Sequence, residues 1–119
     1  MKGILHPFLY DAIDKHGFRV ADEYAENKIY YIEMEFFSDL GEDMFVTIRY
    51  DGTDGDFVKA FLDYYDDFDI DDHVAGLIPM RGKYGIPSSI SDLVHDAEST
   101  KNKLLDLSVA LTNALADTQ

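Results

Sequence analysis

The chain has no cysteine, no tryptophan and only three prolines. Without thiols it has no disulfide framework, no thiolate metal ligand and no cysteine nucleophile, and this composition is typical of a reducing compartment. No run of apolar residues reaches the length of about 18 that a membrane span requires. The segment 1–7 also lacks the continuous apolar stretch of a signal peptide. We therefore expect a cytoplasmic protein with no membrane partner.

Basic side chains are also scarce. Ten Lys and Arg stand against 24 Asp and Glu, which gives a formal net charge of −14. Binding to DNA or RNA depends on cations that displace counterions from phosphates. The ten basic residues are scattered, and the closest of them stand two positions apart, as Lys101 and Lys103 do. We expect no direct contact with nucleic acid, and acidity that serves only solubility stays open as an alternative to a binding role.

Large apolar residues are plentiful: 46% of the chain is hydrophobic, with eight Phe and eight Tyr. That is enough apolar surface for a folded core despite the charge. A length of 119 residues lies near the commonest size of one domain. No internal repeat or linker is visible, so we expect a single domain over residues 1–119.

The spacing of apolar residues predicts the order of helices and strands. Helical spacing begins at Pro7 and stops before Gly17, and alternation of period two follows from Phe18. The expected helices cover 7–16, the segment from Thr53 or Asp54 to about 68, a short piece at 69–78, and 89 to about 116. The expected strands run from 18 to a turn at 25–27, over 28–37 and over 44–50. This order, α-β-β-β-α-(α)-α, predicts an α+β fold with a three-stranded antiparallel sheet and helices packed on one of its faces.

Aspartates gather on the polar side of the helix that follows residue 53 and just beyond its end. Phenylalanine and tyrosine form the opposite stripe of that helix, so the acidic side is expected to face solvent. An exposed helix face offers no cleft for paired carboxylates to act in catalysis. We predict that this face contacts a partner, through Asp56, Asp63, Asp66, Asp67, Asp69, Asp71 and Asp72.

Part of this acidic run matches a calcium-binding loop. Asp67, Asp69 and Asp71 have the spacing of positions 1, 3 and 5 of an EF-hand. Asp72 then stands where that loop needs glycine, and Ile78 where it needs a glutamate. The pattern therefore favours a solvated acidic surface over a calcium site.

No catalytic motif is recognisable. The four histidines, His6, His16, His73 and His95, are far apart and form no H-x-x-x-H pair, so each is expected on the surface or in a loop. The serines at 88, 89 and 91 lack the G-x-S-x-G context of a nucleophile. We expect no enzyme, no cofactor and no metal site. A small enzyme that uses carboxylates with Tyr64, Tyr65 or Tyr84 stays open as an alternative.

The last helix repeats apolar residues every seven positions. The series are Ile90, Ala97, Leu104 and Leu111, and Leu93, Leu107 and Ala114, with Thr100 interrupting the second. Such a stripe packs either on its own sheet or on a second copy of the chain. A helix to residue 116 would span roughly 40 Å, longer than a compact domain of this size. Leu104, Leu107 and Leu111 are therefore the candidate contacts of a possible homodimer.

Three segments between Phe57 and Leu107 carry a resemblance that covers under half of the chain. They read YYDDFDIDDHV, RGKYGIPSSI and DLVHDAE, and they resemble small uncharacterised proteins of Firmicute plasmids and phages. Proteins of that setting include anti-CRISPR and antirestriction inhibitors, many of which are small, acidic and poor in cysteine.

The resemblance implies a non-enzymatic inhibitor that works in the host cell when a phage encodes it. Its partner would be a basic nucleic-acid-binding protein such as a Cas effector, in whose cleft carboxylates replace phosphates. A homodimeric structural or regulatory protein of a mobile element is the alternative.

Overall fold

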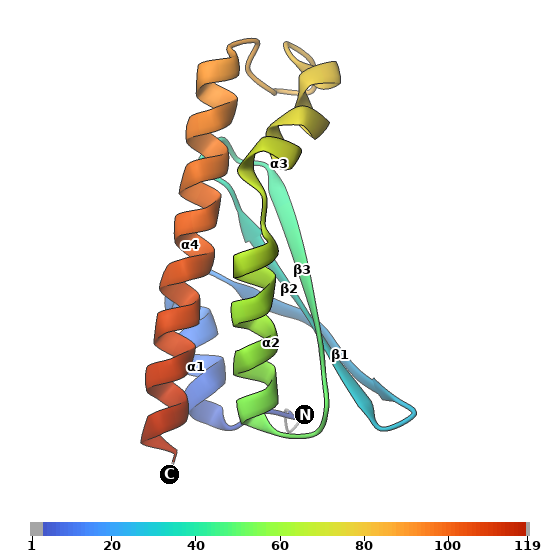
Figure 1. The fold of residues 1–119 in the computed structure, drawn as a ribbon, viewed down its shortest axis with the longest axis vertical. Coiled ribbons are helices and arrows are strands. Elements are labelled where there is room, and N and C mark those ends of the chain that lie inside the picture. Colours follow the sequence, from blue (N-terminus) through green and yellow to red (C-terminus); the bar gives the residue numbers. More distant parts are fainter. Residues whose placement is uncertain (1–3, 119) are drawn as a thin grey trace.

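Helix α4 (Ile90–Asp117) runs along the molecule, and the other helices lie beside it (Figure 1). The computed structural model describes residues 4–118; Met1 to Gly3, part of the segment compared with a signal peptide, and Gln119 lie outside them. Twenty-eight helical residues span about 42 Å, and the molecule measures 46 × 28 × 24 Å. The elongated shape therefore accommodates the whole helix, and our expectation that this helix would be longer than the domain is wrong.

Three shorter helices contact α4 along its length. These are α1 (Pro7–Lys15), α2 (Asp54–Asp67) and α3 (Ile70–Leu77), which continues into the 3-10 turn η1 (Ile78–Met80). Thr53, not Asp54, caps α2, because its hydroxyl accepts a hydrogen bond from the Asp56 N–H at 3.1 Å. Over the described part of the chain, no helix has the length and apolar character needed to cross a membrane.

The chain bends sharply between α2 and α3. Phe68 and Asp69 both have extended backbone angles, which ends α2. The Asp69 carboxylate then accepts a hydrogen bond from the Asp72 N–H at 3.1 Å and caps α3. Phe68 and Asp69 thus form a corner. The acidic run begins on α2 before this corner and continues on α3 after it.

The sheet is an antiparallel meander in the order β1-β2-β3. Its strands are β1 (Arg19–Glu26), β2 (Ile29–Phe37) and β3 (Asp43–Tyr50). Asn27 and Lys28 form a two-residue turn with φ values of 52° and 67°. Positive φ at both residues lets such a turn match the right-handed twist of the two strands that it joins. The turn expected at 25–27 is therefore misplaced, since Ala25 and Glu26 still pair with β2. The hairpin tip extends away from the helices (Figure 1).

The helices cover one face of the sheet, as the alternation of apolar residues predicted. Opposite pairs such as Ile32 with Ile48 and Met34 with Val46 are buried on that face. Phe37 and Phe45 point to the other side and are exposed. A second, smaller apolar cluster lies between α3 and α4, and consists of Val74, Leu77, Leu93 and Ala97.

The apolar stripe of α4 belongs to the core of the single chain. Leu104, Leu107 and Leu111 are only 1%, 0% and 0% exposed and join the main cluster with the sheet. Side chains buried in this way have no surface to offer a second copy, so their assignment as dimer contacts is wrong. Leu105 and Val109, which lie off the stripe, are the exposed apolar residues of this part of α4.

Candidate functional site

All seven aspartates of the predicted contact set are exposed, and they follow one continuous path. α2 carries four of them, the corner carries Asp69, and the first turn of α3 carries the last two. We call this set the aspartate surface: Asp56, Asp63, Asp66, Asp67, Asp69, Asp71 and Asp72. The three residues with calcium-loop spacing are spread across two helices and a corner, so they do not form one loop.

The aspartates of α2 form a row. Asp56, Asp63 and Asp67 are seven and four positions apart, so they share one side of the helix within about 40°. The rise along the axis is about 10 Å between the first two and about 6 Å between the second two. Asp66 lies about a quarter turn away from this row. The α2 part of the surface thus presents carboxylates at regular intervals over roughly 16 Å.

Beside this row, the aspartates border an open groove of about 750 Å³. The expectation of a helix face without a cleft is therefore wrong, because α4 packs across the corner between α2 and α3 and leaves a hollow there. Asp56, Asp63 and Asp72 lie outside the groove. Its lining residues are Asp66, Asp67, Phe68, Asp69, Ile70, Asp71, Val94, Glu98 and Lys101.

The basic residue of the groove, Lys101, is already bound within the chain. Its Nζ donates a hydrogen bond to the Phe68 carbonyl at 2.7 Å and lies 5.3 Å from the centre of the Tyr65 ring. A cation at this carbonyl also complements the negative end of α2. Within residues 4–118, none of the seven aspartates makes an ion pair. The aspartate surface therefore keeps its charge available to a partner.

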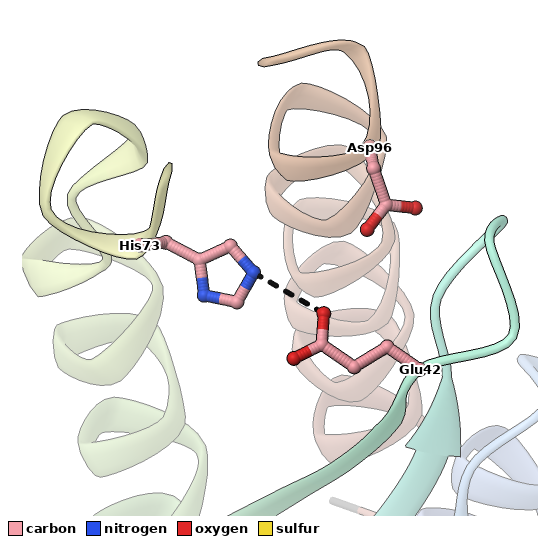
Figure 2. Close-up of side chains that lie close together, drawn as sticks. All are labelled: Glu42, His73 and Asp96. Carbon is pink, nitrogen blue, oxygen red and sulfur yellow. Dashed lines mark ion pairs between the residues drawn. The ribbon is translucent and has the colours of Figure 1, made fainter. Parts of the chain in front are cut away.

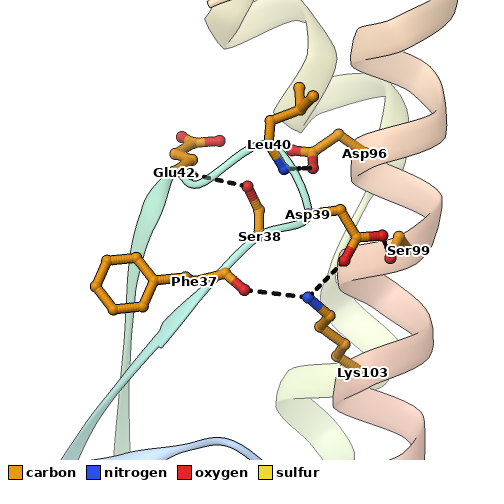
Figure 3. Close-up of polar contacts among 8 residues, drawn as sticks. All are labelled: Phe37, Ser38, Asp39, Leu40, Glu42, Asp96, Ser99 and Lys103. Carbon is orange, nitrogen blue, oxygen red and sulfur yellow. Dashed lines mark hydrogen bonds and ion pairs between the residues drawn. The ribbon is translucent and has the colours of Figure 1, made fainter. Parts of the chain in front are cut away.

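The turn between β2 and β3 is fastened to α4 by side-chain contacts (Figure 3). Lys103 Nζ lies 2.8 Å from an Asp39 oxygen and donates a hydrogen bond to the Phe37 carbonyl at 3.1 Å. The Ser99 hydroxyl donates to the other Asp39 oxygen. These contacts, with that to Lys103 the strongest, lower the pKa of the Asp39 carboxyl.

Asp96, which lies on α4, binds Leu40, the residue that follows Asp39 in this turn. One of its oxygens, Oδ1, accepts a hydrogen bond from the Leu40 N–H at 3.0 Å. The side chain is almost fully enclosed, with the residue 3% exposed. Its second oxygen, Oδ2, has no hydrogen-bond partner among the described residues. A buried carboxylate oxygen without a partner is energetically costly.

Glu42 and His73 converge on the same place as Asp96 (Figure 2). His73 Nε2 lies 3.6 Å from a Glu42 carboxylate oxygen, and one ligand-type atom from each of the three residues lies within 4.8 Å of the others. His73 Nε2 is buried without a hydrogen-bond partner in the described chain. The expectation that His73 is a surface or loop residue is wrong, because it lies on α3 and faces the β2–β3 turn.

The three tyrosines of the enzyme alternative are not gathered in one site. Tyr64 lines a hollow of about 380 Å³ beside Asp72 and His73, and burial raises its pKa. Tyr65 packs under Lys101. Tyr84 lines a different hollow and is 88% exposed.

Comparison of the chain with protein families, with curated proteins and with solved structures found no match.

Proposed function

We propose that this chain is a non-enzymatic inhibitor that binds a nucleic-acid-handling defence enzyme through its aspartate surface. The observation that supports this most directly is that seven exposed carboxylates lie along one path without a pairing cation among residues 4–118. The resemblance to small acidic proteins of phages and plasmids points to the anti-CRISPR and antirestriction type. Such an inhibitor acts in the cytoplasm of the host cell.

The spacing of the row suits a site built for phosphates. Asp63 and Asp67 are about 6 Å apart along the helix axis, which is of the same order as the distance between neighbouring phosphates of one strand. Cas nucleases hold their nucleic acid in positively charged channels and use arginines to recognise a short flanking sequence. The aspartate surface would occupy those cations in competition with DNA, and its association would be steered by charge and weakened by salt.

The test replaces all seven aspartates by asparagine. This changes the net charge from −14 to −7 and keeps the shape of each side chain. Asparagine at position 69 also caps a helix about as well as aspartate does, so α3 is retained. The matched control makes seven substitutions to the corresponding amide elsewhere on the exposed surface and reaches the same net charge. Its positions are Asp11, Asp14, Asp22, Glu26, Asp92, Asp106 and Asp117.

Both variants are assayed for inhibition of DNA cleavage by a guide-loaded Cas nuclease and by a restriction endonuclease, at about 50 and 300 mM salt. The original chain and the control are expected to inhibit at least one enzyme at the lower salt, and the seven-asparagine variant is expected to lose that inhibition. Equal inhibition by the two variants would refute a role for this surface. Failure of the original chain to inhibit either enzyme would count against the proposed class of partner.

A second candidate function is a homodimeric structural or regulatory protein whose acidity serves solubility. Leu105 and Val109 support it, because they are exposed by 37% and 52% and lie one turn apart on α4. Light scattering tests it: the function requires the mass of a dimer, and glutamate at both positions should reduce that mass by half.

A further inference from the structure

We propose that Glu42, His73 and Asp96 bind one divalent cation of the zinc type, which joins the β2–β3 turn, α3 and α4. The three side chains come from three separate elements and lie close together (Figure 2). This site is distinct from the aspartate surface, since none of its ligands belongs to that set.

The geometry agrees with a small metal centre. Protein ligands bind Zn²⁺ at about 2.0–2.2 Å, so two ligands in a tetrahedral arrangement are about 3.4 Å apart. The separation of 3.6 Å between His73 Nε2 and the Glu42 oxygen is close to that value. All three ligand atoms lie within 4.8 Å of one another, so small side-chain rotations suffice to bring them onto one ion.

Asp96 is a buried carboxylate without a counter-charge among the described residues. It is 3% exposed, its Oδ2 has no hydrogen-bond partner among the described residues, and no basic side chain there pairs with it. A buried carboxylate without a counter-charge is strongly unfavourable, and a second carboxylate from Glu42 adds repulsion. A divalent cation would balance both charges and give Asp96 Oδ2 and His73 Nε2 a partner.

One hydrogen bond orients a ligand of the site. Leu40 N–H donates to Asp96 Oδ1 and leaves Oδ2 free for the ion, and such a contact to a ligating carboxylate holds it in place in metalloproteins. The Glu42 backbone N–H donates to the Ser38 hydroxyl, which fixes the backbone of the turn at Glu42. Of the three ligands, Glu42 also lines an open hollow of about 440 Å³.

The ligand set indicates which ion binds. Imidazole nitrogen suits zinc and its transition-metal neighbours, whereas Mg²⁺ and Ca²⁺ prefer sites made of oxygen alone. One histidine with two carboxylates leaves a fourth position of the tetrahedron for water.

The experiment titrates the metal-free chain with ZnCl₂ by calorimetry and records the Tm with and without the ion. We expect one Zn²⁺ per chain and a rise in Tm of at least about 5 °C at saturation. Asp96→Asn keeps an oxygen for Leu40 N–H but removes the charge, and His73→Gln removes the imidazole. Each is expected to weaken Zn²⁺ binding at least 10-fold. Asp96→Asn should in addition raise the Tm of the metal-free protein, which shows that this variant folds.

Two controls separate this site from other metal-binding groups. His95→Gln changes an exposed histidine next to Asp96, and the seven-asparagine variant removes the aspartate surface; both should bind Zn²⁺ like the original chain. Zinc binding that survives Asp96→Asn and His73→Gln would overturn the proposal. So would the absence of a zinc effect, or an equal response to Mg²⁺ and Ca²⁺ at the same concentrations.

Discussion

Replacement of Thr100 by valine is expected to stabilise the protein. Thr100 is 0% exposed, and its hydroxyl oxygen is buried without a hydrogen-bond partner in the described chain. It lies on α4 between Ala97 of the smaller apolar cluster and Leu104 of the larger one. Leaving a buried hydroxyl without a partner costs about 1 to 3 kcal/mol. Valine has the same branched shape and a similar helix propensity, so the substitution removes that cost without opening a cavity.

The free energy of unfolding should therefore rise by about 1 to 3 kcal/mol, or roughly 4 °C in Tm for each kcal/mol. Urea unfolding followed by circular dichroism measures the change, and the m-value should stay constant. Thr112→Val is the matched control, because Thr112 is exposed and its hydroxyl donates to the Ser108 carbonyl; its effect should stay within about 0.5 kcal/mol. A Thr100→Val protein no more stable than the original would refute the argument and show that the hydroxyl has a partner in solution.

Two further predictions concern the core and the alkaline limit of stability. Leu107→Ala should lower the free energy of unfolding by about 2 to 5 kcal/mol in urea and leave the mass by light scattering unchanged; a halved mass at unchanged stability would contradict the core assignment. Burial, and then the hydrogen bond to Glu23, raise the pKa of Tyr10 to about 12. Because this value lies above the unfolded value of 10, the stabilisation by Tyr10 is present below pH 10 and is lost as the pH rises towards 12. Unfolding curves at pH 8, 10 and 11 should show that loss, and Tyr10→Phe should reduce it without abolishing it, since the pKa values of Tyr50 and Tyr64 are raised as well.

Local patterns explain why the α+β fold could be predicted. Alternation in β2 and β3 identified the buried face, and Thr53, Asp69 and Ser89 each stand before a helix that they cap. The hairpin turn was misplaced because it uses Lys28 at a positive φ, which is uncommon for residues other than glycine.

The candidate sites were predictable to different degrees. The seven aspartates could be expected on the surface, because their position opposite an apolar stripe already decides their exposure. The groove beside them could not, since it depends on how α4 crosses the corner at Phe68. The group formed by Glu42, His73 and Asp96 has no spacing in the sequence that would reveal it.

The amino-acid sequence alone determined the acidity of this chain, its lack of thiols, and which side of each helix and strand is apolar. These properties follow from composition and from short-range periodicity, and neither depends on contacts with residues distant in the sequence. Only the tertiary structure decided that the stripe of α4 faces its own core, with Leu107 fully buried. It also decided that Asp96 meets His73 and Glu42. Both depend on packing between segments distant in the sequence, where a rotation of one helix would bring different side chains together.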